Sequence, residues 1–241
     1  MKEENVSAPI RHIVEQLVAR LTTTYGEGLI SVILYGSAAS GEFSAQHSNI
    51  NLVIVLDDAR LEKVKKMQGY LQRYRFRRVA PLFFTEDYIA RSLDVFPIEF
   101  LDMQENYVVF YGKDLFRELR VDTRNLRFQC EQELKSKLIT IKSAYVKIRT
   151  RDELNALLMR SFASVMHLSR NLLRLKGQVP AYVKEELILQ LVAQFNCKAA
   201  IFKRIAEAKR KDSMLSEKET DSLIMELASE LERIIEIVDQ S

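Results

Sequence analysis

Two short apolar runs, separated by a polar loop, constrain the fold of this chain most strongly. They are "LISVILY" (29–35) and "INLVIVL" (50–56). Both are short, rich in β-branched residues and bounded by glycine or polar residues, and these features are typical of buried strands. The first half of the chain is therefore predicted to contain a sheet.

The segments around these runs predict a mixed α/β (α+β) arrangement. Residues 8–25 have apolar positions at helical spacing, with Ser7 as a candidate N-cap and Gly26 as a candidate end. The other segments of this half are predicted in the same way, as a helix at 58–75, a strand at 79–84 whose Pro81 favours an edge position or a bulge, a short helix capped by Thr85, a fourth strand at 96–103, and a segment at 107–116 that fits either a helix or a strand.

From about residue 123 the pattern changes to helical periodicity alone. Apolar stripes recur over 126–145, 154–172, 183–195, 199–209 and 223–238, and Ser216 with Glu219 forms a capping box before the last of them. Four or five antiparallel helices joined by short loops predict a bundle. We therefore expect two domains, a mixed sheet with flanking helices at 1–122 and an all-α bundle at 123–241.

The loop between the two apolar runs carries the candidate site. The chain reads strand, Gly36-Ser37, loop, Asn49-Ile50-Asn51, strand. A glycine allows backbone N–H groups to approach a phosphate closely, and residues at i and i+2 of a strand point to one face. These features predict a cleft in which Gly36, Ser37, Asn49 and Asn51 contact a nucleotide.

This layout resembles the signature of the DNA polymerase β-like nucleotidyltransferase superfamily, in particular kanamycin-type and minimal nucleotidyltransferases with a helical second domain. The resemblance covers about residues 29–116. In that superfamily, positions 49 and 51 hold aspartates that bind Mg²⁺ while a hydroxyl attacks the α-phosphate of a nucleoside triphosphate. The segment "PIEFLDM" (97–103) resembles the third acidic strand and places Glu99 at the third carboxylate, and "VVFYGKDLF" (108–116) resembles the Leu-Tyr-Gly segment that follows.

The two asparagines are where this chain departs from that signature. Replacing two aspartates removes two negative charges, and each asparagine adds an NH₂ donor that would face a cation. Mg²⁺ prefers charged oxygen ligands, so with Glu99 as the remaining carboxylate we expect weak metal binding. A simpler reading stays open, in which Asn49 and Asn51 only end a loop and start a strand.

Several functions remain compatible with these residues. The leading hypothesis is a pseudo-nucleotidyltransferase that acts by binding a nucleotide or a partner. The alternatives are an active, divergent nucleotidyltransferase that modifies a small molecule or a protein, and a non-enzymatic partner-binding module. Arg160 and His167, seven residues apart, loosely resemble the Arg…His motif of HEPN-type ribonucleases, which has four intervening residues rather than six.

Composition limits the cellular setting and the partners. No apolar run approaches a membrane span, the first ten residues do not resemble a signal peptide, and Cys130 and Cys197 are isolated, so we expect a cytoplasmic chain with two buried thiols. Basic clusters at 73–78, 147–151 and 209–211 could contact phosphate or be solvated faces, which leaves nucleic acid open as a partner. Apolar faces on the bundle helices leave a homodimer open.

Overall fold

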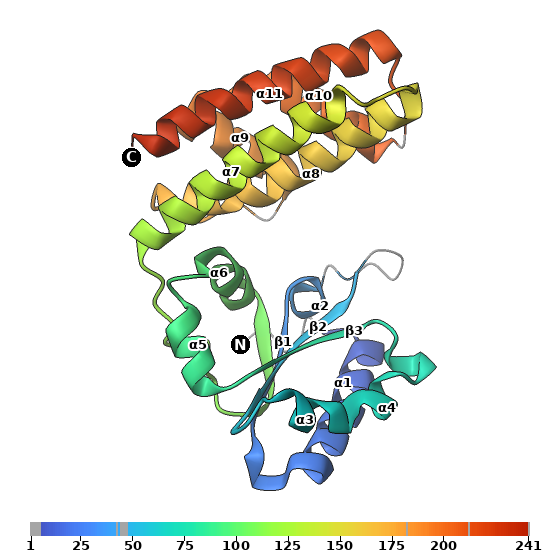
Figure 1. The fold of residues 1–241 in the computed structure, drawn as a ribbon, viewed down its shortest axis with the longest axis vertical. Coiled ribbons are helices and arrows are strands. Elements are labelled where there is room, and N and C mark those ends of the chain that lie inside the picture. Colours follow the sequence, from blue (N-terminus) through green and yellow to red (C-terminus); the bar gives the residue numbers. More distant parts are fainter. Residues whose placement is uncertain (1–5, 42, 44–47, 182, 212, 241) are drawn as a thin grey trace. The chain divides into compact units, whose positions relative to one another are not determined.

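The computed structural model describes residues 6–240 apart from 42, 44–47, 182 and 212 (Figure 1). The chain divides into two compact units, Met1–Asp122 and Thr123–Ser241. The first unit contains a sheet with helices on both faces, and the second consists of helices in its described part. The expected architecture, a mixed sheet followed by a helical bundle, is confirmed.

A four-stranded mixed sheet forms the centre of the first unit. Its strand order is β3-β2-β1-β4. β1 is antiparallel to both of its neighbours, and β3 runs parallel to β2. The three strands predicted at 29–35, 50–56 and 79–84 are confirmed, and β3 lies at a sheet edge, as its Pro81 predicted. The strands are β1 (Leu29–Tyr35), β2 (Ile50–Leu56), β3 (Val79–Phe84) and β4 (Tyr107–Gly112).

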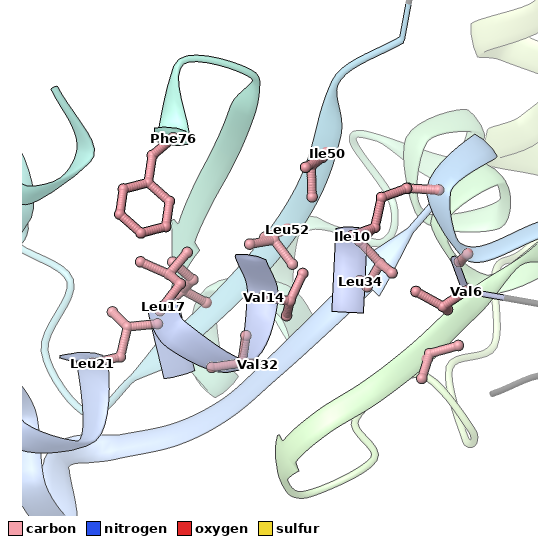
Figure 2. Packing of buried hydrophobic residues seen from close by; sticks show 14 of the residues in the cluster. Val6, Ile10, Val14, Leu17, Leu21, Val32, Leu34, Ile50, Leu52 and Phe76 are labelled. Atoms are coloured by element: carbon pink, nitrogen blue, oxygen red, sulfur yellow. The ribbon is translucent and has the colours of Figure 1, made fainter. Parts of the chain in front are cut away.

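One face of the sheet packs against α1 (Ala8–Tyr25). Figure 2 shows Val14, Leu17 and Leu21 of this helix directed toward the sheet, where the side chains of Val32 and Leu52 meet them. The predicted helix at 8–25 is confirmed, although Ser7 makes no side-chain capping hydrogen bond. Alternation along β1 and β2 thus sends every second residue into this apolar layer.

The segment predicted as one helix at 58–75 is broken into short pieces. Only Met67 and Phe76 are buried in this part of the chain, so no continuous apolar stripe holds a long helix against the sheet. Gly69 also lowers helix propensity at its centre. The pieces are α3 (Leu61–Val64), η3 (Lys65–Met67), α4 (Gln68–Leu71) and η4 (Tyr74–Phe76).

The opposite face of the sheet is covered by α5 (Glu86–Ser92) and α6 (Pro97–Glu105), seen on the left of the sheet in Figure 1. Thr85 caps α5 by accepting a hydrogen bond from the N–H of Tyr88, as predicted. The strand predicted at 96–103 is wrong, because this segment forms α6. Pro97 suits the first position of a helix, and the neighbouring residues Pro97 and Ile98 are both buried, whereas a half-exposed strand would bury only one of the two. The ambiguous segment after it contains β4.

The second unit contains five long helices in its described part, and α8 contacts the other four. Thr150 and Ser216 each cap a helix by accepting a hydrogen bond from the N–H three residues later. The second bond is the serine half of the predicted capping box, whereas the carboxylate of Glu219 pairs with Arg204. Within the described residues, no helix is both long and apolar enough to span a membrane. The helices are α7 (Thr123–Tyr145), α8 (Arg151–Leu175), α9 (Lys184–Phe195), α10 (Ala199–Arg210) and α11 (Glu217–Asp239).

Candidate functional site

The Gly-Ser turn connects β1 to the four-residue helix α2 (Ser37–Ser40). Gly36 has φ 74° and ψ −149°, a backbone conformation that residues with a Cβ rarely adopt. Its N–H donates a 2.9 Å hydrogen bond to the carbonyl of Asn106, which fixes the turn to the residue before β4. A Cβ built on Gly36 would lie 3.4 Å from Nδ2 of Asn51. The fold therefore brings the turn and the second asparagine side by side.

A row of paired residues crosses the sheet next to this turn. Tyr35 of β1 pairs with Tyr107 of β4 on one side and with Asn51 of β2 on the other, and Asn51 pairs with Ala80 of β3. Paired residues of neighbouring strands direct their side chains to the same face. We call Tyr107, Tyr35, Asn51 and Ala80 the cross-sheet row. None of these four side chains is a carboxylate, and the residue beside Asn51 on the parallel strand is an alanine.

The two tyrosines of the cross-sheet row stay protonated at neutral pH. Burial raises the pKa of Tyr35. Burial also raises the pKa of Tyr107, to about 12, and its hydroxyl donates a 3.2 Å hydrogen bond to Asp114, which adds to the effect. The row therefore consists of neutral side chains.

Asn49 is the residue directly before β2 and is exposed. Ser37, at the start of α2, is half-buried. His47 and most of the loop between α2 and Asn49 lie outside the described residues. The structure thus places Gly36 beside Asn51, with Ser37 directly after Gly36 in the chain and Asn49 two residues before Asn51.

Glu99 does not lie on a strand of this sheet. It is exposed in the first turn of α6, where a carboxylate complements the positive end of the helix dipole. Asp102, three residues after Glu99 on α6, shares a face of this helix with it. Sequence reasoning failed here because "PIEFLDM" has both an apolar content suited to a strand and a proline suited to a helix start. A role for Glu99 toward a metal stays a prediction.

The side chains at this site do not fit a pair of magnesium ions. Mg²⁺ requires hard, preferably charged oxygen ligands in octahedral geometry. Asn49 and Asn51 each offer one neutral oxygen, and Ala80 offers none. In the described part of the chain, no three His, Cys, Asp or Glu side chains are grouped so that they could hold a metal ion.

A second feature, which the sequence did not reveal, is a cationic cavity within the helical unit. Its volume is about 230 Å³, and Arg170 of α8, Lys184 of α9 and Lys209 of α10 all line it. Burial lowers the pKa of Lys209, and the positive charge of Lys184 adds to the effect. The lining residues include no acid, and in full they are Phe162, Ala163, Met166, His167, Arg170, Lys184, Leu187 and Lys209.

Three cations converging from three helices on an apolar floor suit a small multivalent anion such as a phosphate group. The sequence contained one part of this signal, the basic cluster at 209–211. Lys184 and Arg170 are far from it in sequence, and only the packing of α8, α9 and α10 brings them together. His167 also lines the cavity, whereas Arg160 is exposed and does not.

A larger cavity of about 580 Å³ lies in the first unit, between α5 and residues 115–120. Two acidic residues of α5, Glu86 and Asp87, line it, but no residue of the predicted site does. This cavity is therefore separate from the candidate site at the Gly-Ser turn.

Comparisons with solved structures place the fold. The chain is similar to spectinomycin adenyltransferase AAD(9) from Enterococcus faecialis, crystallised with ATP and spectinomycin, with a TM-score of 0.58 and 11% sequence identity over 92% of this chain and 99% of that one. This chain has a nucleotidyltransferase fold. At such low identity the similarity shows the fold alone.

The chain also matches a nucleotidyltransferase-like protein from Exiguobacterium sibiricum 255-15, with a TM-score of 0.42 and 13% identity over 92% of this chain and 74% of that one. No protein-family model and no curated protein matches the sequence.

Proposed function

We propose that this protein is a pseudo-nucleotidyltransferase, which keeps the nucleotidyltransferase fold and binds a nucleotide without ordinary two-metal transfer chemistry. The observation that carries the proposal is the cross-sheet row. Two-metal transfer requires carboxylates that bracket the metals, and the row offers Asn51 beside Ala80, with neutral tyrosines on its other side. Asn49 adds a second neutral amide.

Two features support nucleotide binding. The Gly36 turn brings backbone within reach of a phosphate, and asparagine NH₂ groups can donate to phosphate oxygens, a role that aspartate cannot fill. The solved AAD(9) structure contains ATP, so a nucleotide is a chemically reasonable ligand for this fold.

A thermal-shift screen with the four ribonucleoside triphosphates, each with and without 5 mM Mg²⁺, tests this proposal. A ligand that binds only the folded state raises the melting temperature. We expect at least one triphosphate to stabilise the protein, and to do so in EDTA as well as in Mg²⁺. If no triphosphate stabilises it, nucleotide binding is refuted and a partner-binding module becomes the better reading. Stabilisation that strictly requires Mg²⁺ would favour the active, divergent enzyme.

The cationic cavity of the helical unit is a separate candidate for binding phosphate, and it has its own matched pair of variants in this screen. Lys184→Gln with Lys209→Gln removes two cations from the cavity, whereas Lys203→Gln with Lys218→Gln removes two exposed cations that do not line it. Because hydrogen bonds to charged groups contribute about 1.5–3 kcal/mol each, we expect the first pair to weaken triphosphate binding to this cavity at least about tenfold. The second pair should bind as the wild type does. Equal losses in both pairs would contradict a role for this cavity.

Catalysis itself is tested by pyrophosphate release from each triphosphate in the presence of Mg²⁺. Typical enzymes turn over at roughly 1–10³ per second, and we expect this chain to fall far below that range. Transfer at an ordinary enzymatic rate, abolished by Glu99→Gln, would overturn the pseudoenzyme assignment and make Glu99 the retained carboxylate.

A further inference from the structure

The positive charge of this protein is concentrated in one short segment. Residues 60–78 contain eight lysines and arginines and a single acid, Glu62, so the segment carries a net charge of +7. The whole chain carries +3, and the rest of the chain is therefore net −4. This distribution is not what a uniformly mixed, solvated surface would give.

The segment is folded onto the first unit rather than loose. Phe76 is 1% exposed and Met67 is fully buried, and Figure 2 shows Phe76 directed toward Leu17 of α1. The hydroxyl of Tyr70 donates a 3.3 Å hydrogen bond to the carbonyl of Gln16, and that of Tyr25 donates a 3.0 Å hydrogen bond to the carbonyl of Lys63. The apolar side of the segment is thus attached to α1 and the sheet.

The cations of the segment face solvent instead. Among the described residues, no carboxylate lies within ion-pair distance of the six exposed cations, which are Lys63, Lys65, Lys66, Arg73, Arg75 and Arg77. Exposed cations in the helical unit behave differently, since Lys142 pairs with Glu232 and Lys211 with Glu207. Like charges that lack carboxylate partners raise the energy of the folded chain slightly and attract a polyanion.

Aromatic rings lie among these cations. The guanidinium of Arg77 is 4.2 Å from the centre of the Tyr74 ring, and that of Arg73 is 4.7 Å from the centre of the Tyr70 ring. Tyr74 is 76% exposed. Stacked rings and guanidinium groups offer flat surfaces on which nucleobases stack, while the lysines beside them can contact phosphates.

A lipid surface fits this arrangement less well than a nucleic acid does. Membrane-surface helices insert large apolar side chains such as leucine and phenylalanine. Here Phe76 and Met67 point into the core, and Leu61, at 81% exposed, is an isolated aliphatic side chain at the edge of the segment. The exposed aromatic residue, Tyr74, carries a polar hydroxyl and a stacked arginine.

We propose that this surface, the basic face formed by Lys63, Lys65, Lys66, Arg73, Tyr74, Arg75 and Arg77, binds single-stranded nucleic acid. Affinity comes from phosphate contacts by the lysines and arginines, and base stacking on Tyr74 favours single strands over duplex. The binding is independent of base sequence, since the face offers stacking and charge. It is also independent of the proposed nucleotide site, because none of these residues belongs to the cross-sheet row or the cationic cavity.

Fluorescence anisotropy with labelled U20 RNA and dT20 DNA, using the full chain over 50–300 mM salt, tests the proposal. We expect the logarithm of the association constant to fall linearly with the logarithm of the salt concentration, with a slope of about −0.7 for each phosphate contacted. Replacing Lys65, Lys66, Arg73 and Arg77 by glutamine should weaken binding at least about tenfold and make the slope shallower by up to about 3. Tyr74→Ala should weaken binding about fivefold or more with no change in slope, because stacking releases no counterions.

A matched control removes the same charge from the helical unit, with glutamine at Lys198, Lys203, Arg210 and Lys218, and should leave the affinity within twofold of the wild type. Circular dichroism and melting temperature verify that each variant is folded. Absence of oligonucleotide binding, or equal losses from the basic-face variant and the control, would overturn the proposal. Binding to phosphatidylserine vesicles but not to oligonucleotides would overturn it in favour of a membrane-binding face. A duplex that binds as tightly as U20 would overturn the single-strand assignment.

Discussion

Placing aspartates at positions 49 and 51 tests the proposal that this site lacks the carboxylates that a magnesium site requires. In the variant Asn49→Asp with Asn51→Asp, two carboxylates would lie two residues apart at the start of β2. Two residues of a strand span about 6.7 Å. Two unit charges at that separation repel by about 0.6 kcal/mol in water and about 2.5 kcal/mol at an effective dielectric constant of 20. Asn49 is exposed and Asn51 half-buried, so the loss of stability without divalent ions should fall between these limits.

Magnesium should reverse this loss in the double variant and leave the wild type unchanged. For a site with a dissociation constant of about 1 mM, 10 mM Mg²⁺ stabilises the folded state by about 1.4 kcal/mol. For a chain of this size, that corresponds to a rise in melting temperature of roughly 3–6 °C. The measurement is a thermal melt in EDTA, in 10 mM MgCl₂ and in NaCl of matched ionic strength.

Two results would refute the reasoning. A wild-type protein that gains as much from Mg²⁺ as the double variant must contain metal ligands other than Asn49 and Asn51. If NaCl raises the melting temperature of the double variant as much as MgCl₂ does, the gain comes only from screening of the repulsion between the two carboxylates. The charge control is Gln68→Glu with Gln72→Glu, which adds two carboxylates at exposed positions on α4 and next to it and should show no response specific to Mg²⁺. Adding Ala80→Asp to the double variant tests whether a carboxylate beside position 51 strengthens the response to Mg²⁺.

Three further predictions follow from the packing. Gly112→Ala should destabilise the protein by at least about 3 kcal/mol in urea unfolding, because φ is +74° and the new Cβ would lie 1.9 Å from the carbonyl oxygen of Ile30. The control Gly69→Ala, whose Cβ meets no atom within 4 Å, should be neutral or stabilising. Equal effects of the two substitutions would contradict this prediction. Phe76→Ala should cost about 3–5 kcal/mol, because this ring is 1% exposed, and a loss under about 1 kcal/mol would show that the basic segment is not anchored as described. Burial raises the pKa of the Cys197 thiol from 9.0 to about 11. At pH 8 this thiol should therefore react with iodoacetamide about 100-fold more slowly in the native than in the unfolded protein. Rapid labelling of the native protein, detected by mass spectrometry, would contradict its burial.

The elements that could be predicted from sequence are those whose pattern admits one geometry. The strands at 29–35 and 50–56 and the helix at 8–25 combine length, composition and periodicity that agree, and all three are present. The segment at 96–103 combines an apolar content suited to a strand with a proline suited to a helix start. Packed against the second face of the sheet, it forms a helix. The segment at 58–75 looked helical but has too few buried side chains to hold one straight helix.

The sequence by itself determined the division into a mixed sheet and a bundle, and the identity of the side chains at the Gly-Ser loop. Both depend on local information, since periodicity selects the type of each element and Asn49 and Asn51 can be read directly. Tertiary structure alone decided that Ala80 lies beside Asn51, that Glu99 belongs to a helix, and that cations of α8, α9 and α10 share one cavity. Strand order, register and helix packing bring together residues that are distant in the chain, and no local pattern encodes those pairings.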